Sequence, residues 1–200
     1  MGFIVAIDGP AGSGKGTVTK ILAKKLKLNS IDTGAMYRCV TLAIIRNNID
    51  LNDIDKIKEL LETIKIELIE EKDKQIVKLN GEDVSKEIRE NPVNQKVSIV
   101  SAIKEIRLKL VELQREMAKT QDVIMEGRDI TTVVFPNADF KFYFVCSMEK
   151  RAKRRTQDLL KKGEKTSYEE VKALLEKRDF DDRTRKEAPI LKAIDATEID

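Results

Sequence analysis

A glycine-rich loop near the start of the chain, GPAGSGKGT, constrains the fold more than any other stretch. It consists of Gly9, Pro10, Ala11, Gly12, Ser13, Gly14, Lys15, Gly16 and Thr17. An apolar run at residues 3–7 precedes it and is typical of a strand buried on both faces of a parallel sheet. Apolar side chains follow it at helical spacing, at Val18, Ile21, Leu22 and Leu26. Strand, loop and helix together predict a site where backbone N–H groups and a helix N-terminus surround phosphate oxygens.

The residue after Lys15 indicates which kind of phosphate-binding loop this is. Lys15 can reach terminal phosphates as a point charge, but the usual Ser or Thr directly after it is replaced by Gly16, with Thr17 one position later. This spacing resembles the loop of nucleoside monophosphate kinases more than that of GTPases or motor ATPases. The chain also lacks an Asn-Lys-x-Asp base-recognition motif and an apolar run ending in Asp-Glu. A glycine-rich turn without function is the alternative, and the flanking strand and helix argue against it.

The composition excludes several kinds of site. The chain contains no histidine, so a Ser-His or Cys-His nucleophile and a His-bearing zinc site are impossible. The net charge of +3 is too small to predict nucleic-acid binding. Residues 150–186 nevertheless contain 14 Lys and Arg against 8 Asp and Glu. Such a local basic cluster in a nearly neutral protein predicts a small anionic ligand.

Neither a membrane span nor a disulfide is expected. No apolar run approaches the ~18 residues that a membrane helix needs, and we find no leader peptide before the first strand. Cys39 and Cys146 lie far apart in the sequence, which favours two reduced thiols over a disulfide or metal site. These features predict a cytoplasmic protein.

Strands alternate with helices along the chain, which predicts a parallel α/β core. We expect further strands near 30–31, ending at Glu126, at 140–145 and at the end of the chain. Helices are expected at 35–47, at 92–119 with a break near 101–105, and within 150–186. Residues 64–84 instead alternate in a strand pattern and contain Asn80-Gly81, a strong hairpin signal. This small antiparallel sheet is predicted to belong to an insertion.

Two polar motifs are expected at the carboxyl edge of the sheet, where α/β proteins bind ligands. SIDTGAMYR places Asp32 and Thr33 at the end of a short strand and Arg38 on the following helix; a simple helix cap with a solvated arginine is the alternative. EGRDITTVVFP places Arg128 and Asp129 at the end of another buried strand. These two residues suit a phosphate and an amino group, or else form a structural salt bridge.

Charged residues in the basic segment share helical faces. Arg151 and Arg155 are four apart, and Arg178, Asp182 and Arg185 are spaced to share a second face. Solvated charged faces are the plain interpretation. The alternative is a mobile segment whose arginines close over phosphates.

Five motifs occur in order along the whole chain: IDGPAGSGKGT, DTGAMYR, LNGEDVSKEIR, EGRDITTVVFP and KRDFDDRTRKEAP. Together they resemble the bacterial cytidylate kinases. The resemblance implies transfer of the γ-phosphate of ATP, with Mg²⁺, to CMP or dCMP in pyrimidine nucleotide metabolism, by a monomer without nucleic-acid or membrane partners. It also implies a P-loop NTPase fold with a core of five parallel strands at 1–34, 106–153 and 187–200. A monophosphate-binding insertion at 35–105 would hold the antiparallel sheet, and residues 154–186 would form a helical lid.

The resemblance also implies roles for individual residues. The glycine-rich loop would bind ATP, with Thr17 near the metal. The implied CMP ligands are Thr33 and Asp129 at the amino group, Ser98 and Arg107 at the other ring edge, Arg178 and Asp182 at the ribose, and Arg38, Arg128 and Arg185 at the phosphate. The implied catalytic residues are Lys15, Arg128, Arg151, Arg155 and Arg185, of which Arg151 and Arg155 act from the lid.

Three features depart from the family pattern. Thr33 stands where Ser is also familiar, Glu126 stands where Asp is usual, and the family pattern adds a helix after position 200. Two other functions remain open from the residues alone. One is a P-loop kinase for UMP, AMP, shikimate or gluconate, and the other is a nucleotide- or RNA-binding protein without transfer activity.

Overall fold

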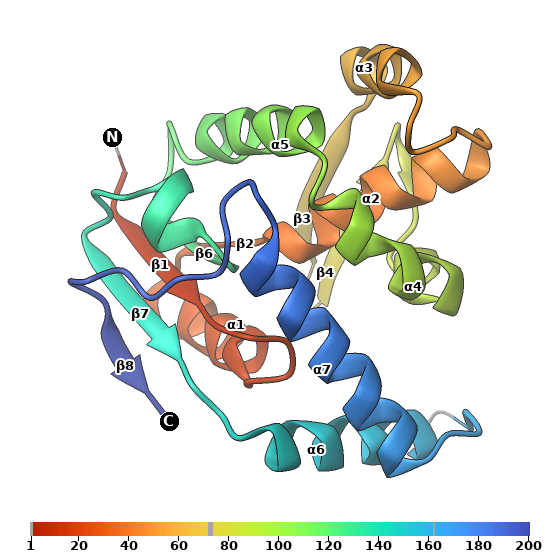
Figure 1. Ribbon diagram of the computed structural model, residues 1–200. Helices are drawn as coiled ribbons and strands as arrows, with labels where there is room; N and C mark the ends of the chain where they lie inside the picture. Colours follow the sequence, from red (N-terminus) through yellow and green to blue (C-terminus); the bar gives the residue numbers. More distant parts are fainter. Residues whose placement is uncertain (1, 72–73, 162) are drawn as a thin grey trace.

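Five parallel strands form the central sheet, in the order β2-β6-β1-β7-β8 (Figure 1). The computed structural model describes residues 2–71, 74–161 and 163–200. The strands are β1 (Ile4–Asp8), β2 (Asn29–Asp32), β6 (Val123–Gly127), β7 (Phe140–Phe144) and β8 (Thr197–Ile199). β1 is central, and its last residue, Asp8, pairs with Gly127 of β6 and Tyr143 of β7. The expected parallel α/β core is confirmed.

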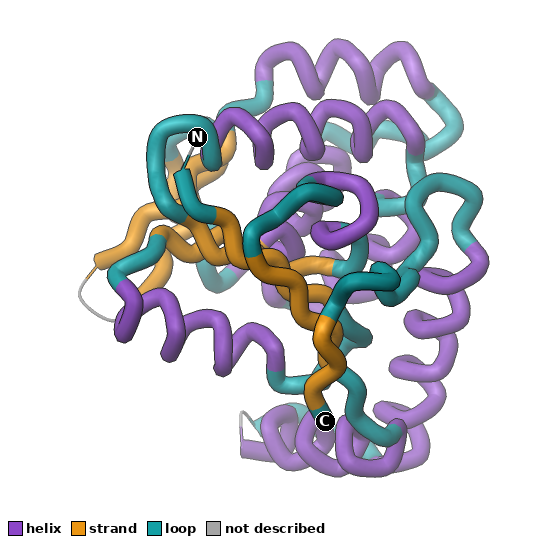
Figure 2. Tube along the Cα trace, turned by 90° about the vertical axis from the view of Figure 1, so that its left-hand side faces the viewer, coloured by secondary structure: helices purple, strands orange, loops and turns teal. Residues whose placement is uncertain are grey.

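Helices cover both faces of this sheet (Figure 2). They are α1 (Lys15–Leu26), α2 (Thr33–Arg46), α3 (Ile54–Thr63), α4 (Asn91–Val100), α5 (Lys104–Met117), α6 (Met148–Lys161) and α7 (Tyr168–Thr184). Alternate residues of β1 face opposite ways: Ile4 and Ala6 join the large apolar cluster with α2 and α5, whereas Val5 and Ile7 join a smaller one with α1. The break expected in the long helical region lies between α4 and α5.

The apolar face expected for α1 is only partly correct. Thr19 and Ala23 are buried and Val18 and Leu22 pack beside them, but Ile21 is 51% exposed and Leu26 is 57% exposed. Ile21 lies two positions from both Thr19 and Ala23, which places it on the opposite side of the helix. The face that meets the sheet therefore carries small residues, which allow a close approach to the strands.

The antiparallel sheet expected at 64–84 is present. It consists of β3 (Ile66–Glu71), β4 (Lys74–Leu79) and β5 (Glu82–Asp83). The Asn80-Gly81 turn joins β4 to β5, and part of the polar turn expected before β4 lies outside the described residues. Gln75 Nε2 donates to the carbonyl of Ser30 at 2.9 Å, so this sheet is attached to β2 of the core.

One apolar cluster runs from the central sheet through α2 to the antiparallel sheet. A separate small cluster joins Ala11 of the glycine-rich loop to Ala152 of α6 and to Val171 and Leu175 of α7. The division into core, insertion and lid stays a prediction. Cys39 is buried, Cys146 is half-buried, and both are free thiols. Among the described residues, no helix is long and apolar enough to span a bilayer.

The Asn80-Gly81 turn generates a stability prediction. Gly81 has φ +86°, and a Cβ added there would meet nothing within 4 Å. Gly81→Ala should therefore lower the free energy of unfolding by about 1–2 kcal/mol through backbone strain alone, measured by urea denaturation. Gly81→Asn is the matched control and should lose less, because Asn adopts this conformation more readily. An equal or larger loss in Gly81→Asn would contradict a backbone origin.

Candidate active site

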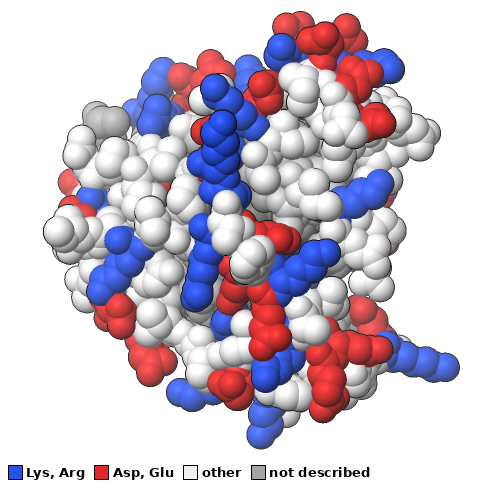
Figure 3. All heavy atoms as spheres, in the orientation of Figure 1, with Lys and Arg blue, Asp and Glu red and all other residues white. Residues whose placement is uncertain are grey.

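A cavity of about 1120 Å³ opens at the carboxyl ends of the central strands. Ten of its lining residues are Lys or Arg and four are Asp or Glu. These charged residues come from the start of α1 at the glycine-rich loop, the ends of β2 and β6, the segment before α4, helices α2, α6 and α7, and the end of the chain after β8. On the face drawn in Figure 3, Lys and Arg form a broken band with Asp and Glu interleaved, whereas the lining of the cavity is mainly basic. This concentration of positive charge suits a compact polyanion.

Lys15 begins α1 and is buried at the cavity wall. Its ammonium group donates to the carbonyl of Pro10 at 3.0 Å. Burial, with the nearby charge of Arg128, lowers the pKa of Lys15 to about 7. A bound anion would favour the charged form of this lysine.

The carboxylate of Glu126 lies against the backbone of Gly16. A Cβ at Gly16 would be 2.7 Å from Glu126 Oε1, so a Ser or Thr at this position would displace the carboxylate. Burial, with the charge of Asp32, raises the pKa of Glu126. This contact links the two departures from the usual patterns, Gly16 and Glu126. The hydroxyl group next along the loop, on Thr17, is exposed and lines the cavity.

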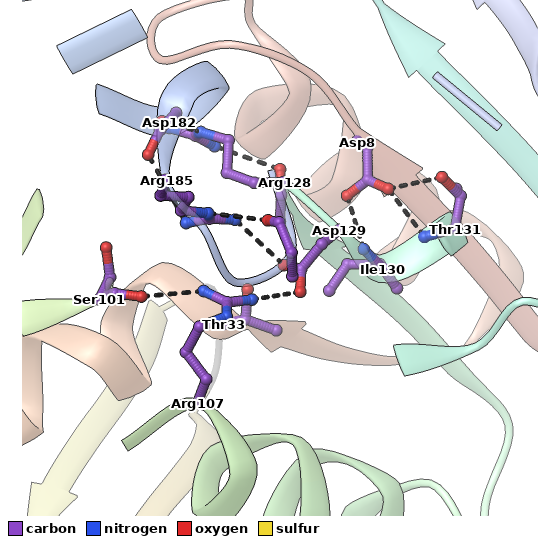
Figure 4. Close-up of polar contacts among 12 residues, drawn as sticks. Asp8, Thr33, Ser101, Arg107, Arg128, Asp129, Ile130, Thr131, Asp182 and Arg185 are labelled. Carbon is purple, nitrogen blue, oxygen red and sulfur yellow. Dashed lines mark hydrogen bonds and ion pairs between the residues drawn. The ribbon is translucent and has the colours of Figure 1, made fainter. Parts of the chain in front are cut away.

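Three predicted base-binding residues, Thr33, Arg107 and Asp129, lie close together (Figure 4), and the sequence neighbours of Thr33 and Asp129 line the cavity. Thr33 Oγ1 donates to the carbonyl of Glu126 at 2.7 Å. Arg107 forms a buried ion pair with Asp129 and donates to the carbonyl of Ser101 at 3.0 Å. Each of these buried polar groups has a hydrogen-bond or ion-pair partner, and these partners fix its orientation.

Arg128, Asp182 and Arg185 continue this network (Figure 4). Arg128 Nε donates to Asp182 Oδ2 at 2.9 Å, and Arg185 lies 3.7 Å from Asp182 and 3.8 Å from Asp129. Burial acts to raise the pKa of Asp182, but Arg128, Arg178 and Arg185 outweigh it and hold the pKa below its usual range. Asp129 and Asp182 thus offset part of the positive charge of Arg107, Arg128 and Arg185.

Arg38 and Ser98 are placed differently from this network. Arg38 lines the cavity and donates to Asn94 Oδ1 at 2.6 Å and to the carbonyl of Ile88 at 3.1 Å. Burial, followed by the charge of Arg178, lowers the pKa of Arg38 to about 9. Ser98 on α4 is half-buried, and its carbonyl accepts from the hydroxyl of Ser101 at 2.9 Å. No contact joins the Ser98 side chain to the network among the residues that the structure describes.

Helices α6 and α7 contribute arginines that differ in whether the protein itself occupies their hydrogen-bond donors. The guanidinium of Arg151 is buried and occupied: it donates to the carbonyls of Ala11 (3.0 Å) and Cys146 (3.1 Å) and pairs with Asp179 (2.6 Å). Arg155 lines the cavity and has no polar partner within the described part of the chain. The buried Nε of Arg178 also lacks one there, and burial with the charge of Arg128 lowers its pKa to about 10.

Sequence reasoning missed several residues of this site. Lys150 and Arg154 of α6 and Arg89 before α4 line the cavity, although all three lie in or beside motifs that we had singled out. Arg154 Nη1 is 3.7 Å from the position that a Cβ on Gly14 would take. The ring of Tyr37 lies 5.4 Å below the guanidinium of Arg107. Helical spacing gave no reason to prefer Arg154 over its neighbours.

Comparison with known proteins identifies the family. A model of the cytidylate kinase family matches residues 5–200. The chain belongs to the cytidylate kinase family. It is 48% identical over 198 residues to the cytidylate kinase of Fusobacterium nucleatum, covering 99% of this chain and 89% of the relative. It is 50% identical to that of Caldanaerobacter subterraneus (93% and 81% covered) and 45% identical to that of Bacillus subtilis (98% and 88%).

The buried lysine of this cytidylate kinase family member generates a prediction. Lys15→Met should raise the melting temperature of the ligand-free protein at pH 6.5, by about 2–4 °C for each kcal/mol gained, because it removes a buried charge. Between pH 7 and 10.5 the unfolded chain binds more protons at position 15 than the folded one, so wild-type stability at this position rises with pH. The advantage of the variant should therefore shrink towards pH 9.5 in a thermal-shift series.

The exposed residue Lys20, on the same helix, provides the control. Lys20→Met should give only a small difference in melting temperature, because this side chain is exposed. A Lys15→Met variant that is less stable at pH 6.5 would show that the lysine is not destabilised by its burial.

Proposed function

We propose that this protein transfers the γ-phosphoryl group of ATP to CMP or dCMP, giving ADP and CDP or dCDP. One observation carries the proposal: the cavity on the phosphate-binding loop adjoins the buried cluster of Thr33, Arg107 and Asp129. Polyphosphate recognition and recognition of an aminated ring then lie next to each other at one edge of the sheet. Membership of the family supports the same reaction.

The acceptor needs no general base. A nucleoside monophosphate is already an anion and a competent nucleophile, in agreement with a chain that contains no histidine. Catalysis then consists of aligning two polyanions, offsetting their repulsion and excluding water. The ten basic side chains of the cavity supply the positive charge.

In this proposal the loop residues 9–17 bind the phosphates of ATP. Arg38, Arg128 and Arg185 bind the phosphate of CMP. Its oxygens take over some of the contacts that Arg128 and Arg185 make with Asp129 and Asp182. Thr33 and Asp129 accept from the cytosine amino group, and Arg107 with Ser98 meets the other ring edge. Arg178 and Asp182 hold the ribose. Each polar group freed from an internal ion pair thereby gains a ligand partner.

For α6 we infer a division of labour between Arg151 on one side and Arg154 and Arg155 on the other. Arg151 has its donors engaged by Ala11, Cys146 and Asp179, so it ties the phosphate loop to α6 and α7. Arg154 and Arg155 have no polar partners in the described ranges and face the same cavity. They are the side chains available to reach the transferring phosphoryl group.

The cavity residues fit a magnesium ion that arrives with ATP. The described residues include no group of three or more His, Cys, Asp or Glu side chains that would hold a resident metal. The Thr17 hydroxyl and the carboxylates of Asp32 and Glu126 line the cavity, and Mg²⁺ is commonly held by one or two such groups together with waters and phosphates. When bound, the ion would be held by these groups and would offset the charge of the phosphates. We further propose a cytoplasmic monomer that acts on free nucleotides.

The proposal predicts a substrate order. In a coupled assay with ATP and Mg²⁺, CMP and dCMP should give the highest kcat/KM among CMP, dCMP, UMP, AMP and GMP. Lys15→Ala and Arg128→Ala should reduce kcat by about 10³-fold, comparable to the loss of an arginine finger, while the circular dichroism spectrum is unchanged. Preferred turnover of AMP or UMP would favour another monophosphate kinase. Nucleotide or RNA binding without turnover would indicate a non-catalytic protein.

The division of labour on α6 predicts opposite defects. Arg154→Gln should lower kcat by at least about 10-fold with an unchanged melting temperature, since it removes charge without breaking a contact. Arg151→Gln should lower the melting temperature by several degrees, because Asp179 and two carbonyls lose a buried donor. The reverse pattern in the two variants would show that Arg151 is the residue that contacts the phosphoryl group.

A further inference from the structure

Asp8 is a fully buried carboxylate that none of the motif roles uses. It is the last residue of β1, directly before the glycine-rich loop. Its oxygens accept hydrogen bonds from the N–H of Ile130 (2.9 Å), the N–H of Thr131 (2.7 Å) and the hydroxyl of Thr131 (2.6 Å) (Figure 4). No ion pair to Asp8 occurs among the residues that the structure describes.

Such a carboxylate is costly to bury. Desolvation raises the pKa of Asp8, and the hydrogen bonds from Thr131 and Ile130 offset only part of that effect. An apolar side chain would fill this space without the desolvation cost of a carboxylate. The three convergent donors therefore indicate that the anchor itself is useful.

The anchored segment follows Arg128 and Asp129 directly. Gly127 is held by β1 through the sheet, where it pairs with Asp8, and Ile130 begins a short π-helix, Ile130–Val134. Arg128 and Asp129 thus lie between two attachments to the same residue, one through the backbone of Asp8 and one through its side chain. Rotation of this turn would displace both side chains from their positions beside Asp182 and Arg107.

We propose that Asp8 is a positioning residue that sets Arg128 and Asp129 relative to the phosphate-binding loop. β1 is then connected to both binding sites. Its C-terminal end leads into the phosphate-binding loop, and the side chain of its last residue, Asp8, anchors the turn that carries Arg128 and Asp129. This inference rests on the proposed function, since it assigns Arg128 and Asp129 to CMP. Its effect should appear in the acceptor parameters, because a misplacement of about 1 Å can cost 10²-fold in rate.

Asp8→Asn tests the anchor with little change in shape. If the amide oxygen takes the position of Oδ2, it can still accept from the N–H and hydroxyl of Thr131, but the NH₂ group then faces the N–H of Ile130, so the turn loses at least one hydrogen bond. We expect kcat/KM for CMP to fall about 100-fold and the KM for ATP to stay within about threefold of wild type. A change confined to the KM for ATP would overturn the proposal, because it would show that Asp8 acts on the donor loop through its charge.

Thr131→Val is the second test and changes no charge. It removes only the hydroxyl donor and should lower kcat/KM for CMP about 10-fold, whereas Thr131→Ser should restore it. Thr41→Val is the matched control: Thr41 is also fully buried, and its hydroxyl donates to the carbonyl of Tyr37 at 2.8 Å within α2. It should lower the melting temperature without changing the CMP parameters.

The outcomes separate the inference from the function on which it rests. If the wild-type protein does not phosphorylate CMP, the proposed function fails. If the wild type is active but folded Asp8→Asn and Thr131→Val keep wild-type CMP kinetics, the positioning role fails. If Asp8→Asn does not fold, the Thr131→Val variant decides the question. The positioning role is also refuted if Thr41→Val lowers kcat/KM for CMP as much as Thr131→Val does, because the loss would then follow from reduced stability alone.

Discussion

Positive charge crowded at one edge of the sheet is the constraint on which the rest of this structure depends. Lys15 is buried and Arg38 and Arg178 are half-buried, all three near other cations; desolvation and these charges lower their pKa values to about 7, 9 and 10. Asp129, Asp179 and Asp182 balance part of that charge through buried ion pairs. The rest remains for a ligand, so phosphates would relieve a repulsion that the folded chain otherwise maintains. Much of the binding energy is in this sense prepared before the ligand arrives.

The carboxylates that balance the arginines also join distant parts of the chain. Asp182 of α7 meets Arg128 at the end of β6, and Asp179 of α7 meets Arg151 of α6, which in turn holds the loop carbonyl of Ala11. Closure or opening of the basic helices would therefore act on the phosphate loop and the acceptor turn together. If ligand phosphates take over these contacts, as proposed above, substrate occupancy would be coupled to the position of the helices.

The strand–loop–helix start, the Asn80-Gly81 turn and the break between α4 and α5 were predictable because each depends on local periodicity or turn chemistry. The position of Arg128 and Asp129 at the carboxyl edge of the central sheet was also predictable, because they follow a strand of a parallel sheet. The exposed Ile21 was not predictable, since the side of α1 that meets the sheet depends on the sheet's own surface. The engagement of Arg151 could not be predicted either, because its partners Ala11 and Asp179 are 140 and 28 residues away.

By itself the sequence determined the phosphate-binding loop, the family motifs and a chemistry without a histidine base, because these depend on residue identity and short spacing. Only the tertiary structure decided which arginines are engaged by the protein and which face the cavity. It also placed Glu126 against Gly16 and made Asp8 the anchor of the Arg128–Asp129 turn. The reason is physical: the charge state and orientation of a buried polar group are set by partners that meet it through folding, and linear spacing carries no record of them.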